Sequence, residues 1–244
     1  MSTDRFFFCH IPKTAGLSTM ASLERQFGKD AIYPLPDDAD NVDAPHDIDH
    51  LRTVFEARGH QIKVVAGHFP LCVRELLGVP FRTFTVLRDP VDRTLSHLRF
   101  QQKIDPQYVG MTLEEAYSVP INLFAAIHNQ MVKMLGMELG EMNAGSLSFV
   151  DFTQEHLDRA KAALDDMDVV GVQSRYPSFI ADLEQTFGWS LGEPVRSNTT
   201  EAAPVGDFFA AHIANDNALD VELHQYALEL VANRYRAAGL ITPG

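Results

Sequence analysis

The sequence predicts an α/β fold in which a central, mostly parallel sheet is flanked by helices in three layers. Short apolar runs of strand length alternate along the chain with longer segments of helical periodicity. The predicted strands are almost continuously apolar, as is typical of parallel sheets that helices cover on both faces. With 244 residues, 45% of them hydrophobic, the chain can bury a substantial core, and we expect residues 1–244 to form a single domain.

Four runs rich in β-branched and aromatic residues predict buried strands at residues 5–11, 62–66, 81–87 and 169–172. Helical patterns lie between and after these strands, at residues 16–27, 89–103, 113–135, 156–164, 178–187 and 218–238. Two segments rich in Pro, Asp or Gly predict loops at residues 34–49 and 188–206, and we expect the first of them to be exposed.

The first three predicted strands end in residues that can do chemistry. The first strand leads into His10-Ile11-Pro12-Lys13, the second into Gly67-His68 and the third into Arg88-Asp89-Pro90. Parallel strands place their carboxyl ends at one edge of a sheet, and open α/β sheets bind ligands at that edge. We therefore expect the three strand ends to face one site.

The loop after the first strand predicts a phosphate site. Backbone N–H groups, the start of a helix near Ser18 and the Lys13 ammonium would converge there, which is how proteins hold phosphate. The hydroxyls of Thr14, Ser18 and Thr19 can donate to the same phosphate, although Ser18 can equally cap the helix. The loop lacks the GxxxxGK[ST] spacing of nucleoside-triphosphate sites, because its lysine precedes its glycine.

The segment after the third strand predicts a second anion site. Asp89 fits the N-cap of the following helix and Pro90 its first position, so Arg88 stands at the strand tip. Arg88 and the Ser96 hydroxyl can then converge on another phosphate, with the arginine supplying a bidentate fork. Ser96 can instead be a small packing residue, and for Arg93 we favour an i,i+4 ion pair with Asp89.

Histidines supply the candidate bases. His68 follows a strand and a glycine at the shared edge, which suits a general base, although a lone histidine is often structural. His10 is a competing candidate, but we expect it to pack against the loop or bond its backbone. His46 and His50 lie among aspartates, yet an acidic loop favours no metal there. Asn129-Gln130 either lines an acceptor site or forms a polar helix face.

Charge and composition exclude several classes of function. A formal net charge of −13 argues against general affinity for nucleic acid or anionic membranes. The two cysteines, Cys9 and Cys72, have apolar surroundings and are interpreted as reduced, buried thiols. No apolar run has the length of a membrane span, and the chain enters its first strand without room for a signal peptide. We therefore expect a cytoplasmic protein.

The segments HIPKTAGLS and LRDPVDRTLS resemble the two phosphate-binding motifs of the sulfotransferases that use 3′-phosphoadenosine 5′-phosphosulfate, PAPS. The resemblance is to the carbohydrate branch that includes the uronyl 2-O-sulfotransferases. Weaker echoes follow in the family's order, at residues 66–69, 128–130, 170–176, 196–200 and 219–223. The resemblance implies a P-loop-like three-layer fold, PAPS as co-substrate and no metal. Without a membrane anchor, the chain resembles a bacterial, cytoplasmic member.

Carried over residue by residue, the family pattern implies three groups of site residues. Those for the 5′-phosphosulfate would be Pro12, Lys13, Thr14, Ala15, Gly16, Ser18 and Thr19. Those for the 3′-phosphate would be Arg88 and Ser96, with a late nucleotide-covering loop at Arg196, Thr199 and Thr200. The catalytic residues would be Lys13 and His68. Two positions depart from the pattern: Leu17 replaces a common threonine, and Ala66 replaces a second histidine found in some relatives.

The function that the resemblance implies is transfer of the sulfuryl group from PAPS to a hydroxyl acceptor, such as a sugar on a glycan, glycolipid or metabolite. The transfer would be in line, with a histidine as the base. One alternative is a P-loop-like small-molecule kinase, which would need Mg²⁺ and a nucleoside triphosphate. Another is a non-catalytic nucleotide-binding module of the same fold. The acidic loop 37–49 would disfavour a polyanionic glycan if it borders the acceptor site.

Overall fold

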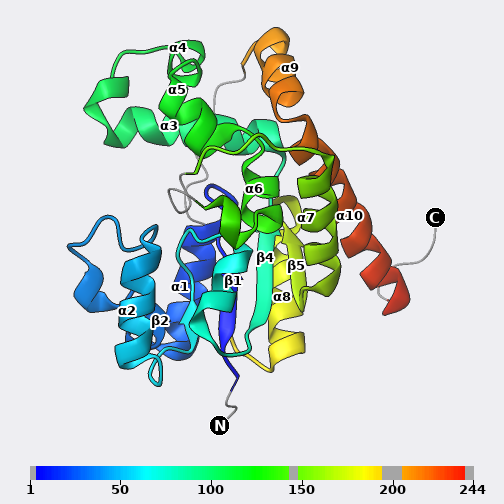
Figure 1. Cartoon of the computed structure of the whole chain (residues 1–244). Helices are drawn as coiled ribbons and strands as arrows, with labels where there is room; N and C mark the ends of the chain where they lie inside the picture. The colour runs from blue at the N-terminus through cyan, green and yellow to red at the C-terminus, as the bar shows by residue number, and fades with distance from the viewer. Residues whose placement is uncertain (1–3, 143–147, 194–204, 240–244) are drawn as a thin grey trace.

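The computed structural model describes residues 4–142, 148–193 and 205–239. In this part of the chain, five strands form one sheet in the order β2-β3-β1-β4-β5, and every neighbouring pair is parallel. The sheet confirms the predicted α/β class (Figure 1). The strands are β1 Phe6–Cys9, β2 Ile32–Tyr33, β3 Val64–Val65, β4 Arg82–Leu87 and β5 Val169–Val172.

Helices follow most of the strands, as the sequence pattern predicts. The described α-helices are α1 Gly16–Phe27, α2 Ile48–Arg58, α3 Pro90–Ile104, α4 Leu113–Tyr117, α5 Pro120–Asn122, α6 Gln130–Gly136, α7 Gln154–Asp166, α8 Tyr176–Phe187, α9 Asp207–Asp216 and α10 Ala218–Ala237. The first of them has the predicted bounds, and the last ends one residue earlier than predicted.

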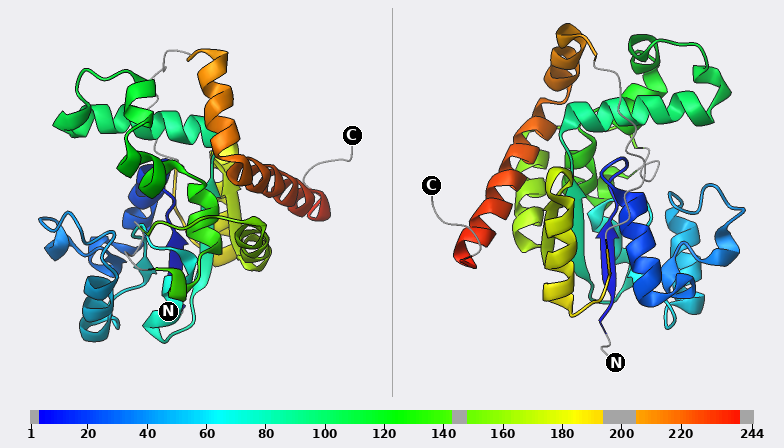
Figure 2. Two further views of the ribbon diagram at one scale, coloured as in Figure 1. Left: turned by 45° about the horizontal axis from the view of Figure 1, so that its top comes forward. Right: turned by 180° about the vertical axis from the view of Figure 1, so that it is seen from behind.

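The sheet is the middle of three layers, because alternate side chains of each strand point to opposite faces. Phe7 and Cys9 of β1 belong to a core shared with α2, α6, α7 and α10. Phe6 and Phe8 belong to a second core, shared with α1 and α8. The two helical layers are visible from opposite sides in Figure 1 and the right panel of Figure 2.

A third apolar cluster lies beyond the carboxyl edge of the sheet. It joins side chains of α3, α4 and α9, including Leu98, Tyr117 and Phe209. In Figure 1 the strands point upward toward this group of helices, with α3 running across their ends. The cluster therefore covers the carboxyl edge of the sheet, where the sequence predicts a site.

The structure differs from the predicted elements in one divided helix and in three elements that were not predicted. The segment 113–135 is not one helix: it is divided into α4, α5, a π-helical turn Leu123–Ile127 and α6. Pro120 starts a new helix, and Asn129 adopts the left-handed conformation (φ 43°) before α6. Strand β2 and helices α2 and α9 were not predicted, and α2 begins at Ile48 within the segment predicted as a loop.

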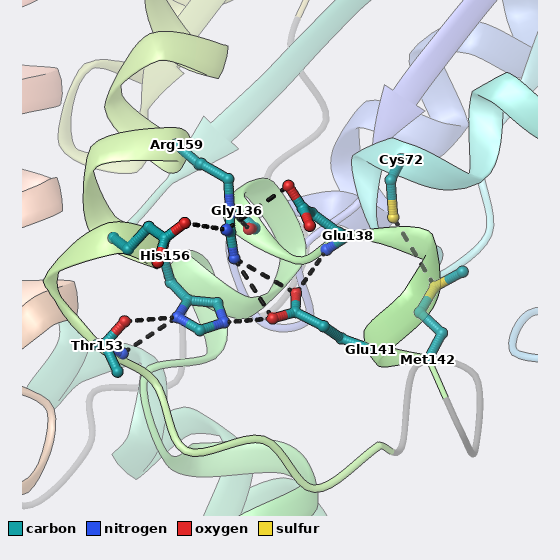
Figure 3. A network of polar contacts seen from close by, with 9 residues as sticks. Cys72, Gly136, Glu138, Glu141, Met142, Thr153, His156 and Arg159 are labelled. Atoms are coloured by element: carbon teal, nitrogen blue, oxygen red, sulfur yellow. Dashed lines mark hydrogen bonds and ion pairs between the residues drawn. The ribbon is translucent and has the colours of Figure 1, made fainter.

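A polar network joins the end of α6 to the start of α7 (Figure 3). Arg159 Nε donates to the Gly136 carbonyl (2.8 Å), and its guanidinium also contacts Glu141 (3.4 Å). His156 Nε2 lies 2.9 Å from Glu141 Oε1, and the two helices approach so closely that a Cβ on Gly136 would lie 2.1 Å from the His156 carbonyl oxygen. The network joins α6 to α7, which lies in the same helical layer.

Candidate functional site

The three strand ends singled out in the sequence are neighbours in space. β3, β1 and β4 are consecutive in the sheet, so His68, Lys13 and Arg88 follow adjacent strands at its carboxyl edge. The connection between the last two is direct, because Arg88 Nη1 donates to the Lys13 carbonyl oxygen at 3.3 Å. The topology thus brings the predicted residues to one place, as the parallel arrangement requires.

The loop between β1 and α1 has an unusual backbone. Lys13 (φ 70°) and Ala15 (φ 77°) both adopt the left-handed conformation, which residues with side chains rarely adopt. No side chain of the described residues caps α1, so the N–H groups of its first turn remain available. Exposed N–H groups at a helix N-terminus form a site for an anion.

A close approach beneath the loop explains its glycine. His10 packs against Gly16 so tightly that a Cβ there would lie 1.5 Å from the imidazole Nε2. His10 also bonds the Ala66 carbonyl oxygen through Nδ1 (3.2 Å) and stacks on Phe8. The imidazole therefore supports the loop from below, the role predicted for it.

Lys13 lies among other cations. Its Nζ sits 4.0 Å from the centre of the Phe100 ring, above the aromatic face. Burial lowers the pKa of Lys13, and the neighbouring charges of Arg88 and Lys103 lower it further. An ammonium held near two other cations creates a positive potential that suits a phosphate or sulfate group.

Arg88 has hydrogen-bonding capacity that the described protein does not use. Its Nε is buried without a hydrogen-bond partner among the described residues. Burial lowers the pKa of Arg88, while Asp92 and Asp89 act in the opposite direction. Ser96 lies two turns into α3 and is partly exposed. A buried guanidinium N–H without an acceptor fits the anion site predicted here, because leaving it unpaired costs free energy.

The hydroxyls of the loop are largely engaged by the protein. Thr14 Oγ1 donates to the Ile11 carbonyl (2.8 Å), and Thr19 Oγ1 donates to that of Ala15 (3.2 Å). Thr14 and Thr19 are fully buried, and Ser18 is nearly so. Pro12 and Ala15 are partly exposed. The two threonine hydroxyls are thus bonded to backbone carbonyls, whereas no side chain of the described residues caps the first N–H groups of α1.

His68 is held in one tautomer. Its Nδ1 lies 2.9 Å from the His10 carbonyl oxygen. Because a carbonyl oxygen only accepts, Nδ1 carries the proton and Nε2 keeps its lone pair. Burial, followed by the nearby His10, lowers the pKa of His68 well below its ordinary value. The ring is therefore neutral at physiological pH and able to accept a proton at Nε2.

A second histidine from a distant segment approaches the same ring. The centres of the His46 and His68 rings are 5.0 Å apart, and those of His10 and His68 are 4.3 Å apart. The sequence gives no sign of this neighbour, because His46 belongs to a segment interpreted as an exposed loop. Among the described residues, no group of three or more His, Cys, Asp or Glu side chains could hold a metal ion.

Arg93 corrects the prediction made for it. Its guanidinium does not pair with Asp89: it is fully buried and donates from Nη2 to the carbonyl oxygens of Ala126 (3.1 Å) and Ile127 (3.0 Å). The reason is helix orientation, since Asp89 caps the start of α3 through the Asp92 N–H. Arg93 thus ties α3 to the segment before α6.

Two aromatic residues of the site were missed in the sequence. Phe100, beneath Lys13, lies one helical turn beyond Ser96 on α3, so the same helix face carries both. Tyr176, whose hydroxyl lies 3.3 Å from Thr19 Oγ1, follows β5. Applying the strand-end rule to the fourth predicted strand as well would have found it.

Two further predictions concern the nucleotide-covering loop and a membrane span. The predicted nucleotide-covering residues Arg196, Thr199 and Thr200 lie outside the described residues. Within the described ranges, no helix combines the length and the apolar character that crossing a membrane requires.

Comparisons with known proteins find distant relatives. No family model matches the chain. Heparan-sulfate 6-O-sulfotransferase 1 from Cricetulus griseus and from Mus musculus is 29% identical over 187 residues, and heparan-sulfate 6-O-sulfotransferase 2 from Homo sapiens is 28% identical over the same length. The match covers 64% of this chain but 46%, 44% and 30% of these relatives, so the chain spans less than half of their length. The chain is thus distantly similar to heparan-sulfate 6-O-sulfotransferases.

Proposed function

We propose that this protein is a PAPS-dependent sulfotransferase that transfers the sulfuryl group to a hydroxyl of a saccharide. The observation that carries the proposal is the pairing of two basic, anion-ready segments, the β1–α1 loop with Lys13 and the β4 end with Arg88, joined by a hydrogen bond. A donor with a 5′-phosphosulfate and a separate 3′-phosphate needs two such segments side by side. The distant relatives support the same class of reaction.

The donor fits the residues that surround the loop. The Lys13 ammonium and the first N–H groups of α1 would bind the 5′-phosphosulfate, with Pro12, Thr14, Ala15, Gly16, Ser18 and Thr19 shaping the cradle. Arg88 would bind the 3′-phosphate through the buried Nε that has no partner in the described chain, assisted by Ser96. We also propose Arg196, Thr199 and Thr200 as donor contacts, from the sequence motif alone.

The proposed reaction is an in-line displacement at sulfur. His68 Nε2 accepts the proton of the acceptor hydroxyl as that oxygen bonds to sulfur. The bond from sulfur to the bridging phosphate oxygen breaks, and adenosine 3′,5′-bisphosphate leaves with the electron pair. Lys13 stabilises the negative charge that develops on the bridging oxygen. The lowered pKa of His68 keeps its ring neutral and ready for this role.

The branch of the family, the origin and the location of the protein are proposed from the sequence alone. The motifs favour the uronyl 2-O-sulfotransferase branch, whereas the relatives named above carry the 6-O designation. We therefore propose a carbohydrate sulfotransferase without assigning the position that it sulfates. A bacterial origin, a cytoplasmic location, a single domain over residues 1–244 and catalysis without a metal stay predictions from the sequence.

Nucleotide binding separates this proposal from a kinase. Calorimetry is expected to show that adenosine 3′,5′-bisphosphate binds more tightly than AMP, because AMP lacks the 3′-phosphate. A kinase would instead bind ATP with Mg²⁺ more tightly, and that result would refute the proposal.

Turnover separates the proposal from a non-catalytic module. PAPS-dependent release of adenosine 3′,5′-bisphosphate is measured with a panel of saccharide acceptors, and Lys13→Ala is expected to reduce the rate by about 10²-fold or more. Lys29→Ala is the matched control, since Lys29 is an exposed lysine after α1 whose ammonium contacts Glu24. Nucleotide binding with no release for any acceptor would favour the non-catalytic module.

A further inference from the structure

The segment between β2 and α2 is largely exposed, as the sequence predicts, but its residues 44–46 dock onto the site. The Pro45 carbonyl oxygen accepts a hydrogen bond from the His68 N–H (2.7 Å), and the His46 ring lies beside the His68 ring. The Tyr33 hydroxyl donates to the Ala44 carbonyl (2.9 Å), which fixes the segment from the other side. A Cβ on Gly67 would lie 2.9 Å from the Pro45 carbonyl oxygen, so the approach is close.

The order of the strands sets the order in which the site residues lie along the carboxyl edge of the sheet. Across the carboxyl edge, the docked segment follows β2, His68 follows β3, Lys13 follows β1 and Arg88 follows β4. In the proposed function, the donor anions lie at Lys13 and Arg88. With His68 as the base, the acceptor hydroxyl would reach the sulfur from the His68 side, which is the side on which the docked segment lies.

That side of the site is acidic. Residues 34–50 contain six aspartates and no lysine or arginine. Three aspartates have ion-pair partners and one caps α2: Asp37 with Arg58, Asp38 with His50, Asp49 with Arg52, and Asp47 at the helix N-cap. For Asp40 and Asp43, the described chain supplies no ion pair, and both are exposed.

Asp43 brings a negative charge near His46, the neighbour of the proposed base His68. Its backbone carbonyl accepts from the His46 N–H (2.8 Å) in a tight turn. Its carboxylate acts electrostatically on the His46 imidazole, which lies beside His68. The negative charge thus stands one side chain away from the proposed point of acceptor attack.

We infer that the segment 40–47 is the acceptor-facing wall of the site, and that it selects saccharides without anionic groups over polyanionic glycans. The inference rests on the proposed function and names its substrate class. In water, each repulsive pair of unit charges at about 10 Å weakens binding by about twofold. A glycan with several carboxylates near Asp40 and Asp43 therefore loses about tenfold at low salt, and less at high salt.

The test compares two acceptors of equal length, a neutral oligosaccharide and one in which alternate sugars are uronic acids. The full chain is expected to release adenosine 3′,5′-bisphosphate with a kcat/KM about tenfold higher for the neutral acceptor at low ionic strength. Raising the salt concentration is expected to narrow the difference, because screening weakens the repulsion.

Charge-neutral variants identify the segment responsible. The double variant Asp40→Asn/Asp43→Asn is expected to raise the uronate-to-neutral ratio of kcat/KM by about threefold or more at low salt. Asp30→Asn is the matched control, since Asp30 is an exposed aspartate before β2, at the opposite edge of the sheet. It is expected to leave the ratio unchanged.

Two results would overturn the inference: preference of the unaltered chain for the uronate acceptor, or an unchanged ratio in the double variant. If neither acceptor is turned over, the same pair is compared by binding to the chain saturated with adenosine 3′,5′-bisphosphate. Tighter binding of the uronate again overturns the inference, and weaker binding that the double variant relieves supports it. Failure to bind that nucleotide counts against the proposed function instead.

Discussion

At the residue scale, Arg88 is the side chain whose unused hydrogen-bonding capacity can be tested most directly. Its Nη1 bonds the Lys13 carbonyl, whereas its buried Nε has no partner in the described part of the chain. We expect Arg88→Ala to weaken binding of adenosine 3′,5′-bisphosphate by about 10- to 100-fold, because a hydrogen bond to a charged group contributes about 1.5–3 kcal/mol. Binding of AMP is expected to change much less.

Calorimetry with both nucleotides measures this difference. Arg52→Ala is the control, since Arg52 is an exposed arginine of α2 that contacts Asp49. Equal losses for the two nucleotides in Arg88→Ala would show that Arg88 does not recognise the 3′-phosphate.

His68 gives a prediction about pH. Burial lowers its pKa well below the ordinary value of 6.5, and the neighbouring His10 adds to the effect. The neutral ring is the active base, so a lowered pKa keeps the base available as the pH falls. We expect the acid limb of kcat/KM to lie below pH 6.5, and His68→Gln to lose about 10²-fold or more in turnover while nucleotide binding persists.

The measurement is a pH–rate profile of the unaltered chain and of His60→Gln, in which an exposed histidine after α2 is replaced. The control is expected to keep the profile. An acid limb above pH 7, or near-normal turnover in His68→Gln, would remove His68 as the base.

At the element scale, the β1–α1 loop depends on the absence of a side chain at Gly16. A Cβ there would overlap His10 Nε2, and the imidazole is held by Ala66 and Phe8. We expect Gly16→Ala to destabilise the fold by about 1–3 kcal/mol and to weaken nucleotide binding at least tenfold, because the loop must shift.

Thermal unfolding and calorimetry measure the two effects. Gly140→Ala is the matched control, since no atom lies within 4 Å of a Cβ added there. Combining Gly16→Ala with His10→Ala removes the clash and is expected to restore part of the binding. A Gly16→Ala variant that binds normally would show that the close packing does not shape the loop.

Elements were predictable from the sequence where one local signal was strong. Helix α1 and strand β5 have the predicted bounds, because apolar periodicity and flanking Gly or Asp residues define them locally. The segment 113–135 was not, since Asn129 adopts a left-handed conformation that tertiary contacts support: its N–H donates to Asn217 and its side chain accepts from the Asp220 N–H. Such contacts span about ninety residues of sequence and leave no local pattern.

At the scale of the whole molecule, the sheet order explains what the sequence could tell about the site. The carboxyl ends of the strands lie at one edge in any parallel sheet. The proximity of Lys13, His68 and Arg88 could therefore be predicted once each was placed at the end of a strand. The His46 neighbour and the Phe100 ring were missed, because each comes from an element that reaches the edge by packing rather than by strand direction.

Asp220 links three distant parts of the molecule and gives the last prediction. The carboxylate on α10 is fully buried and accepts from the N–H groups of Met131 (3.0 Å) and Val132 (2.8 Å) at the start of α6. The charge of Arg93 on α3 also acts on it. Burial raises the pKa of Asp220 to about 6, so the folded chain prefers the protonated carboxyl more than the unfolded chain does.

The sign of the pH effect follows from this difference. Between about pH 4 and 6 the folded state holds the proton that the unfolded state has lost, so this group makes the folded chain less stable as pH rises. Asp220→Asn mimics the neutral form and lacks this loss. We therefore expect its free energy of unfolding, relative to the unaltered chain, to rise by on the order of 2 kcal/mol between pH 4 and pH 7.

Asp220→Ala separates charge from hydrogen bonding at the same position. It leaves the two α6 N–H groups without their acceptor and opens a gap where α10, α6 and α3 meet, so we expect destabilisation at both pH values. Denaturant unfolding of the three chains at each pH provides the measurement. If Asp220→Asn lost stability relative to the unaltered chain as pH rises, the ionised carboxylate beside Arg93 would be a net stabilising contact, and the junction of the three helices would depend on that charge pair rather than on its hydrogen bonds.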